Sequence, residues 1–413
     1  MSRYPRLTQP TIHPISHRDP LANHSWIACS TILFKQRLEK HHFRSSWVRN
    51  ARASEVTKFS IAGRSGGEGI VYVINIHERE GFDLFRTAQE TEECLPNKGL
   101  SPKIAHLVAE RARLTVAITS DAVDREEEIP LGATKIGGYP DLPPSMAWPI
   151  RPPYPKGEDV REEHLKSAGN IPKISWMSEE ERRNHRSEAL ELADGAMREA
   201  PLGFIAQIDL AAVAAVADLG ADFPKEGRLL LFYDVKQQPW GFRLGDEVRA
   251  RLIFDETPVS ALMRKSAPED IAETRMDPLR CNLAAALICE SPYSRTFDNF
   301  EDNDGDLLLE WSDDLELPNG SHRVGGYPTQ IQNDMALECV LLTRGIDLSH
   351  GSELVFDSDV ERERQSWVFL VQIASDGNNA MMWGDSGMLY LWIHRDDLKM
   401  RRFVKARLIL QCP

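Results

Sequence analysis

One hexapeptide occurs twice in this chain of 413 residues with little change. KIGGYP spans residues 135–140, and RVGGYP spans residues 323–328. Paired glycines supply the positive φ or the bulge that a sharp turn needs, and the proline after them stops a strand. Each hexapeptide therefore predicts the turn by which part of the chain enters a sheet. A phosphate-binding loop needs a longer glycine pattern at the start of a helix, so neither hexapeptide predicts a phosphate site.

The segments that follow the two hexapeptides also match. GFIAQIDL and then GRLLLFY follow the first, while WVFLVQIASD and then GMLYLWI follow the second. Gln207 and Gln372 occupy the same place in the first segment of each set. Three features in one order predict an internal duplication with pseudo-twofold symmetry. We expect two halves, at about 101–260 and 300–413, joined by a helical connector.

Short apolar segments with turn residues between them dominate residues 101–413. Leu114, Val116 and Ile118 alternate with small or polar residues, which is the period of a half-buried strand. A parallel doubly wound sheet needs strands that alternate with long helices, and this alternation is missing. The sequence therefore predicts an α+β fold rich in antiparallel sheet, with helices at its periphery.

Two helix starts can be predicted from capping residues. Ser178 with Glu181 forms a capping box within a charged segment at residues 156–200, which is expected to be a surface insertion. Asp209 is placed to cap the alanine-rich helix that follows it, and Gly220 is expected to end that helix.

The net charge of −14 is spread unevenly along the chain. Residues 1–66 hold 11 Lys and Arg against 3 Asp and Glu, which leaves −22 for the remainder. We expect residues 1–66 to form a basic and mostly disordered arm, followed at 67–100 by a connector that contains the strand IVYVINI. An acidic body repels nucleic acid and suits a basic protein partner. We therefore expect no nucleic-acid binding by the body.

Cysteine spacing and targeting signals indicate a reducing compartment. The six cysteines form no CxxC pair and do not lie beside histidines at metal-ligand spacing. No stretch reaches the ~20 apolar residues that span a bilayer, and the chain begins with no secretory signal. The acidic stretch DNFEDNDGD departs from a calcium loop, because Phe300 occupies the first ligand position. We expect a cytoplasmic protein with no metal, no cofactor and no membrane association.

The segment WGDSG is the first candidate for a binding site. Trp383 offers a flat apolar surface, while Asp385 and Ser386 offer a carboxylate and a hydroxyl that could hold a sugar, a peptide or an amine. The same residues equally predict a tight turn that leads into a strand. The other elements of a serine-protease pattern are missing, so we reject that class of enzyme.

The two glutamines and the two tyrosines of the repeated segments are further candidates. Gln207 and Gln372 are amides within apolar strands, so each either hydrogen-bonds the GGYP turn of its own half or lines a cleft shared with the other. Tyr139 and Tyr327 are expected to pack over the neighbouring half. We favour the structural interpretation of all four, because most buried amides are satisfied by nearby backbone.

These signatures together resemble the YwqG-like family, whose domain has no known function. KIGGYPDLPPSMAWP, FIAQIDL, FPKEGRLLLFYD, PWGF and MMWGDSGMLYLWIHRDDL occur in that order, and PWGF adds Trp240 to the binding candidates. The resemblance covers roughly residues 100–413. The basic arm, the 156–200 insertion and the acidic 298–314 segment depart from the family pattern. The resemblance implies an intracellular, sheet-rich α+β protein, and it implies no catalytic residues.

Three hypotheses for function follow. The leading one is a non-catalytic module that binds a protein or peptide in the groove between the halves, since nine tryptophans and two tyrosine-bearing turns suit an interface. A toxin-neutralising partner is one form of it, because proteins similar to the family occur beside contact-dependent toxins. The first alternative is an enzyme of unrecognised type that uses Asp209, Asp385 or Gln372 in that groove. The second alternative is a scaffolding protein.

Overall fold

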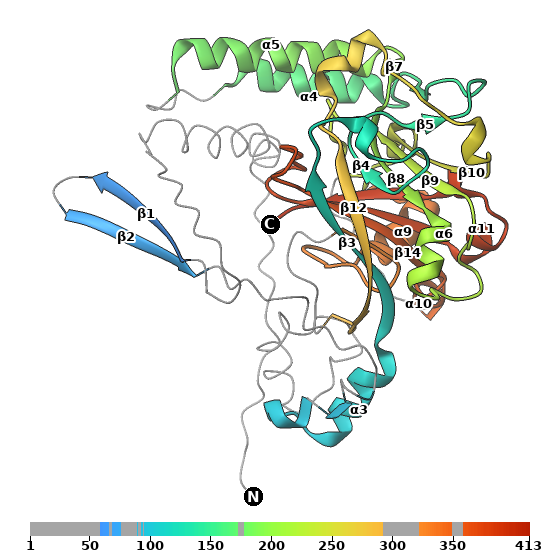
Figure 1. Ribbon diagram of the computed structural model, residues 1–413. Helices are drawn as coiled ribbons and strands as arrows, with labels where there is room; N and C mark the ends of the chain where they lie inside the picture. Colours follow the sequence, from blue (N-terminus) through green and yellow to red (C-terminus); the bar gives the residue numbers. More distant parts are fainter. Residues whose placement is uncertain are drawn as a thin grey trace, which may run out of the picture.

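A ten-stranded antiparallel sheet forms the centre of the molecule. The computed structural model describes residues 58–65, 68–75, 89, 92–93, 95–171, 177–291, 322–348 and 358–413 (Figure 1). In sheet order the strands are β10 (Ala250–Asp255), β9 (Arg228–Tyr233), β8 (Gly203–Asp209), β4 (Lys135–Ile136), β12 (Leu279–Ile288), β3 (Arg113–Ala122), β13 (His322–Val324), β14 (Trp367–Ala374), β15 (Met388–His394) and β16 (Arg407–Gln411). Every neighbouring pair is antiparallel. The predicted α+β class with a large antiparallel sheet is therefore confirmed.

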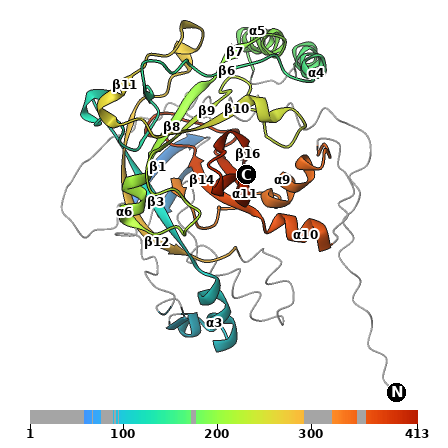
Figure 2. The same cartoon turned by 90° about the vertical axis from the view of Figure 1, so that its right-hand side faces the viewer.

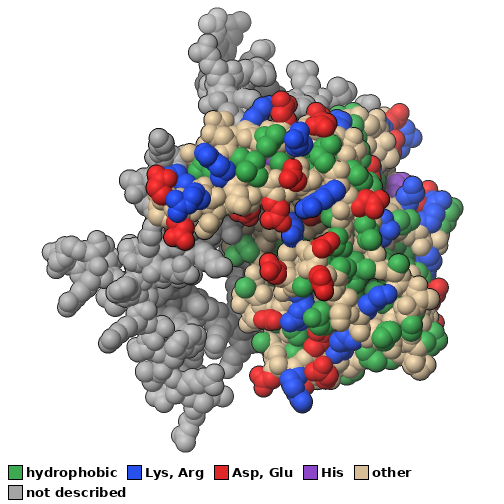
Figure 3. All heavy atoms as spheres, turned by 90° about the horizontal axis from the view of Figure 1, so that it is seen from above, with side chains coloured by type: hydrophobic (Ala, Val, Ile, Leu, Met, Phe, Trp, Pro, Cys, Tyr) green, Lys and Arg blue, Asp and Glu red, His purple; other side chains and the backbone are tan. Residues whose placement is uncertain are grey.

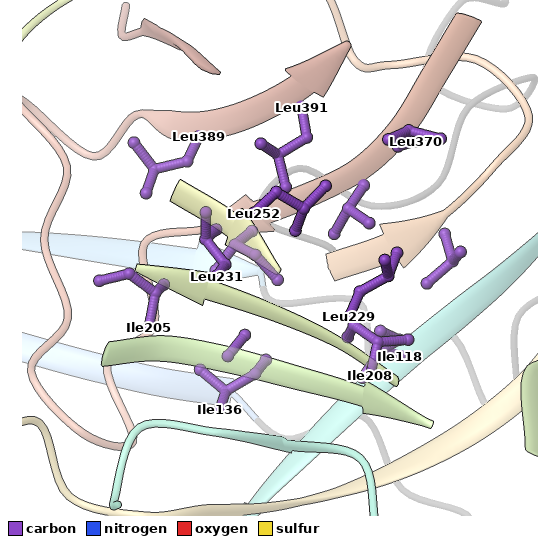
Figure 4. Close-up of a cluster of buried hydrophobic side chains, with 14 of the residues drawn as sticks. Ile118, Ile136, Ile205, Ile208, Leu229, Leu231, Leu252, Leu370, Leu389 and Leu391 are labelled. Atoms are coloured by element: carbon purple, nitrogen blue, oxygen red, sulfur yellow. The ribbon is translucent and has the colours of Figure 1, made fainter. Parts of the chain in front are cut away.

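The sheet curls until it is nearly barrel-shaped, and its two ends approach each other. The backbone N–H of Leu410 in β16 donates to the carbonyl of Trp240, in the loop that leads to β10. Figure 4 shows leucines and isoleucines of β8, β9 and β10 facing those of β14 and β15. This apolar cluster fills the interior, which explains why strands such as β9 are buried along their whole length.

Separate layers cover the outside of the two ends of the sheet. The proline-rich stretch after the first hexapeptide places Leu142 and Trp148 against Phe204 and Phe232 of β8 and β9. On the other end, α9 (Met335–Thr343) packs on the aromatic side chains of β14 and β15. Because both faces are covered there, these strands are apolar on both sides and lack the alternation of β3.

The remaining helices lie at the periphery, as expected. They are α3 (Pro102–Arg111), α4 (Gly157–Gly169), α5 (Glu179–Ala196), α6 (Leu210–Val216), α10 (Ser358–Arg364) and α11 (Arg395–Lys399). In Figure 1, α4 and α5 of the predicted 156–200 insertion lie side by side across the top of the sheet. Ser178 and Glu181 form the predicted capping box of α5.

Short elements complete the described chain. They are β1 (Lys58–Ser65), β2 (Glu68–Asn75), β5 (Asp141–Leu142), β6 (Ile150–Arg151), β7 (Ala200–Pro201), β11 (Met263–Arg264), η1 (Leu95–Lys98), η2 (Glu126–Glu128), η3 (Asp246–Arg249), η4 (Val259–Ala261), η5 (Glu269–Thr274) and η7 (Phe403–Lys405). Strand β1 forms a hairpin with β2, so a strand occupies the end of the expected basic arm. None of the helices in the described ranges is long and apolar enough to cross a membrane.

Two sequence predictions about elements need correction. The stretch between the expected halves contains the long central strand β12 instead of a helical connector. Its side chains alternate, with Leu279 and Leu283 towards the core and Arg280 and Asn282 exposed, which is a strand period. Helix α6 ends at Val216, before the expected Gly220, because Ala217 takes an extended backbone and the chain leaves the helix there.

Some predictions fall outside the described residues. These are most of the basic arm and the acidic stretch at 298–306.

Candidate functional site

Each GGYP turn joins a two- or three-residue strand to a bulge in its neighbour. Gly137 and Gly138 have φ values of 70° and 72°, and Gly325 and Gly326 have values of 70° and 75°. The N–H of Gly137 donates to the carbonyl of Ile205, where β8 has a register shift. The predicted positive φ is therefore present in both turns.

The second turn makes the same backbone contact as the first. The N–H of Gly325 donates to the carbonyl of Leu370, where β14 also has a register shift. A bulge leaves one carbonyl out of the regular ladder, and in both places a glycine N–H satisfies it.

The two glutamines fasten these turns. The Oε1 atom of Gln207 accepts from the N–H of Asp141 at 3.1 Å, and the Oε1 atom of Gln372 accepts from the N–H of Thr329 at 2.9 Å. Both side chains are fully buried. Each amide thus bonds the backbone directly after its own turn, as the structural interpretation expects. Gln207 lies opposite Leu230 under the outer layer on β8 and β9, and Gln372 lies opposite Tyr390 under the outer layer on β14 and β15, so the two amides do not meet in one cleft.

A buried cluster of charges lies behind the first turn. The Nζ atom of Lys135 lies 3.0 Å from Asp141 and 3.2 Å from Glu126, and Arg264 lies 3.1 Å from Asp141. Burial lowers the pKa of Lys135, although the two carboxylates oppose this shift. Burial alone would raise the pKa of Asp141, but Lys135 and the N–H of Gly132 outweigh it and lower that pKa. The cluster holds the turn in place, since each buried charge has an opposite partner.

The corresponding cation behind the second turn is Arg323, which has different partners. Its guanidinium donates to the carbonyl of Tyr327 and to the hydroxyl of Thr329. Thr329 stands where the first turn has Asp141, so the two turns differ in the charge next to the buried cation.

The tyrosines of the turns pack against cations. The guanidinium of Arg275 lies 4.8 Å from the ring centre of Tyr139, and that of Arg113 lies 4.4 Å from the ring centre of Tyr327. Tyr327 also packs on Ala117 of β3 and donates its hydroxyl to the carbonyl of Arg111. Both rings are half-buried.

Asp209 caps a helix, as predicted. Its Oδ1 atom accepts from the N–H groups of Ala211 and Ala212 at the start of α6. In the sheet, Asp209 of β8 lies opposite Arg228 at one end of β9, whereas Tyr233 at the other end of β9 contacts Trp383. The five residue steps from Arg228 to Tyr233 span about 17 Å, so Asp209 and the WGDSG segment lie far apart.

The WGDSG segment forms a tight turn whose tryptophan lies in the core. Trp383 is 2 % exposed and stands edge-on to Tyr233 with ring centres 5.8 Å apart, so its indole is not the open apolar surface that the sequence suggested. Ser386 has a φ of 61°, and the N–H of Gly387 donates to the carbonyl of Trp383. Asp385 and Ser386 are exposed at the tip.

Trp240 belongs to the closure of the sheet. Its ring packs against the interior cluster and lies 6.1 Å from Phe242, while its carbonyl accepts from β16. It is half-buried and does not approach either GGYP turn through any contact within the described part of the chain.

The sequence matches a protein family described as a domain of unknown function (DUF1963) over residues 134–412. The chain belongs to the DUF1963 family. The match includes both GGYP turns, both glutamines and the WGDSG turn, and it begins after β3. A search of curated proteins found no match.

A polar cluster that the sequence did not predict joins two residues of the DUF1963 domain to Ser120 of β3, which precedes the match. The Nε2 atom of His322 lies 3.1 Å from Asp376, which also accepts from the hydroxyl of Ser120. The Nδ1 atom of His322 accepts from the N–H of Ala374, so Nε2 carries the hydrogen that Asp376 accepts. Burial alone would raise the pKa of Asp376, but the bonds from His322 and Ser120 hold it at about 2.

This cluster has no free nucleophile among its contacts. The hydroxyl of Ser120 donates its hydrogen bond to the carboxylate of Asp376 instead of to His322. In a catalytic triad the serine hydroxyl donates to the histidine. Cys281 lies opposite Ser120 in the sheet, and burial, with Asp376 nearby, raises the pKa of its thiol to about 12. Ser120, His322 and Asp376 come from β3, β13 and the loop after β14. No local sequence pattern could therefore have revealed the cluster that they form.

A pocket of about 310 Å³ opens between the end of α5 and the turn after β9. Its charged lining comes from four separate parts of the DUF1963 domain: Arg151, Glu191, Arg198, Glu199, Asp234, Lys236 and Asp270. Sequence reasoning missed it, because these residues share no motif.

Two ion pairs in the pocket are already complete. Arg151 is buried and donates to Asp234 and to the carbonyl of Gly195 near the end of α5. Lys236 lies 2.9 Å from Glu191. Both pairs line the pocket.

Three other charges of the pocket remain available. Arg198, Glu199 and Asp270 are exposed, and none of them forms an ion pair with a residue that the structure describes. Since two of the three are carboxylates, the pocket has a small excess of negative charge. In the described ranges no group of three or more His, Cys, Asp or Glu is arranged to hold a metal ion.

Proposed function

We propose that this protein is a non-catalytic binding protein that accepts a basic segment of another protein in the pocket between α5 and β9. The observation that carries the proposal is the pocket itself, whose volume of about 310 Å³ can hold a Lys or Arg side chain with its flanking backbone. In place of the expected groove between two halves, we propose a pocket lined by residues of the first half and by Asp270 of the stretch that follows it.

The electrostatics of the pocket support a cationic ligand. Glu199 and Asp270 outnumber Arg198 among the charges that have no partner in the described chain. The pocket also borders the carboxyl end of α5, where the helix dipole favours positive charge. The net charge of −14 would speed the association of a basic partner at low ionic strength.

The enzyme alternative would place Asp209, Asp385 or Gln372 in a groove between the two halves. Asp209 caps α6, Gln372 is fully buried against Thr329, and Asp385 lies at an exposed turn. Their separation favours binding over catalysis by this set. A scaffolding role has no specific observation in its favour.

We also propose that the domain arose by duplication and belongs to the YwqG-like group. Both GGYP turns contact a bulge and a buried glutamine in the same way, and both short strands flank the central pair β3 and β12. Thr134 and His322, one residue before each short strand's Lys or Arg, both accept a backbone N–H from the next strand. These matches support duplication.

A cytoplasmic location fits the same proposal. Cys281, Cys339 and Cys412 are free thiols in the described part of the chain, as a reducing compartment requires. A toxin-neutralising role is one specific form of the binding function, because a small basic toxin would match the charge of the pocket.

Quantitative affinity capture tests the proposal. Tagged protein is incubated with lysate, and bound proteins are measured by mass spectrometry for the parent, for Asp270→Lys and for Glu199→Lys. We expect a stoichiometric basic partner for the parent and a loss of at least about tenfold for both variants, because each reversal places a cation against a cation. Asp385→Lys is the matched control, since it makes the same charge change at an exposed site outside the pocket lining.

Either of two results would contradict the proposal. The first is that no protein is recovered in stoichiometric amount. The second is that Asp385→Lys reduces recovery as much as the pocket variants do, because the effect would then come from overall charge.

A further inference from the structure

The connection between β15 and β16 exposes two large apolar side chains. Met400 is 62 % exposed and Val404 is 70 % exposed, which are the highest values for large hydrophobic residues in the described chain. Isolated exposed apolar residues are common, but here two lie four residues apart in one turn.

The core holds this turn in place. Leu398 and Phe403, which flank Met400, are 1 % and 2 % exposed, and the ring of Phe403 lies 5.0 Å from that of Phe254. Arg401 has a φ of 57°, a conformation that is unfavourable for a residue with a side chain. This conformation ends α11, because the N–H of Arg402 donates to the carbonyl of Asp397 and the N–H of Arg401 donates to that of Leu398. The helix end and the buried side chains together fix the outward position of Met400.

Cations surround the two apolar side chains. Arg395 pairs with Asp222, and Arg402 pairs with Asp397. Lys399, Arg401 and Lys405 are exposed and form no ion pair with any residue that the structure describes. Residues 395–405 hold five Lys and Arg against Asp396 and Asp397, a balance of +3, whereas the whole chain carries −14.

The turn lies at the outer edge of the molecule. Helix α11 is at the right-hand edge in Figure 1 and faces the viewer in Figure 2. In Figure 3, Lys and Arg side chains gather along the right-hand rim, on the same side. Nothing among the described elements covers Met400 or Val404.

We propose that residues 395–405, the basic ridge, adsorb to the surface of a membrane that contains anionic phospholipid. Met400 and Val404 enter the headgroup region, and Lys399, Arg401 and Lys405 contact lipid phosphates. This binding is independent of the pocket. The sequence predicts no membrane association on the ground that no segment can span a bilayer, but adsorption needs no spanning segment.

A bilayer fits the basic ridge better than a protein partner does. A stable protein interface covers about 800 Å² on each side and needs a complementary shape, whereas the ridge offers two protruding apolar side chains. A bilayer surface accepts protruding side chains without a preformed pocket. Each Lys or Arg close to an anionic leaflet strengthens adsorption about fivefold. The acidic body is screened beyond about 8 Å at physiological salt, so it does not cancel this attraction.

Vesicle co-sedimentation with the full-length protein tests the inference. The vesicles are phosphatidylcholine with and without phosphatidylserine. We expect binding that requires phosphatidylserine and weakens with added salt. Lys399→Glu with Lys405→Glu should reduce the partition coefficient at least about tenfold, and Met400→Ser with Val404→Ser should reduce it severalfold at constant charge.

Matched controls isolate the ridge. Val259→Ser with Met263→Ser removes two apolar side chains that are 50 % and 48 % exposed elsewhere, and it should leave binding unchanged. Thermal melting checks that every variant is folded. The basic N-terminal residues are present in all proteins, so their attraction to the vesicles cancels in the comparison.

The inference is overturned by equal binding to both kinds of vesicle, or by ridge variants that bind as the parent does. It is also overturned if soluble polyglutamate, but not phosphatidylserine vesicles, binds through the ridge, because the partner would then be an acidic protein.

Discussion

At the scale of single residues, the glycines of the GGYP turns leave no room for a side chain. A Cβ atom added to Gly137 would lie 2.3 Å from the carbonyl oxygen of Asp277, and the φ of 70° is unfavourable for alanine. We expect Gly137→Ala to lower the free energy of unfolding by roughly 3 kcal/mol or more, from strain and displacement of the turn. Chemical denaturation measures this loss.

Gly345→Ala is the control for that prediction. Gly345 has a φ of 80°, but no atom lies within 4 Å of the Cβ position. We expect a loss of only about 1 kcal/mol, from the backbone conformation alone. Equal losses for the two variants would show that the contact with Asp277 has no energetic role.

Glu338 makes stability depend on pH. It is 8 % exposed in α9, its Oε2 atom has no hydrogen-bond partner, and burial raises its pKa from 4.5 to about 7. The folded protein thus keeps a proton that the unfolded chain has lost, so stability from this group falls as pH rises from about 4.5 to about 7. Glu338→Gln cannot ionise.

We expect Glu338→Gln to be more stable than the parent by roughly 3 kcal/mol at pH 8 and nearly equal to it at pH 4.5. Denaturation curves of both proteins at several pH values measure the difference. A gap that stays constant across this range would contradict the assignment of the raised pKa to Glu338.

At the scale of elements, the stability of α6 distinguishes a capping role of Asp209 from a chemical one. If the carboxylate serves the helix, Asp209→Ala should lower stability by about 1 kcal/mol and Asp209→Ser by less, because serine also caps. Urea titration measures both. Unchanged stability of Asp209→Ala would reject the capping role and return Asp209 to the candidates for chemistry.

The elements that could be predicted from sequence are those with local causes. The capping box at Ser178, the cap at Asp209 and the bond from Gln207 to its own turn all depend on neighbours in sequence or on a repeated segment. The pocket was missed because Arg151 and Asp270 are brought together only by the fold. Trp383 was misplaced for a related reason, since its burial depends on Tyr233 in a distant strand.

At the scale of the whole molecule, β3 is the strand on which the sheet depends. It lies before the DUF1963 match at 134–412, yet it pairs with β12 along its full length and with β13 on its other side. Val116 and Ile118 contribute to the interior cluster. We expect a truncated protein that begins at residue 134 to be unfolded by circular dichroism and proteolysis.

A truncated protein that begins at residue 100 is the control, because it keeps α3 and β3. We expect it to retain a cooperative thermal transition. If both truncated proteins fold equally well, the sheet does not need β3 for its stability, which would contradict the prediction.

The central claim, that the pocket binds a basic segment, is tested most directly by fluorescence anisotropy with labelled peptides. The probes are blocked hexapeptides with a central Arg-Lys pair or a central Glu-Glu pair, titrated with the parent and with Asp270→Lys. The account predicts that the basic peptide binds, that Asp270→Lys weakens this binding at least about tenfold, and that the acidic peptide does not bind. Equal binding of both peptides, or binding of the basic peptide that Asp270→Lys leaves unchanged, would contradict it.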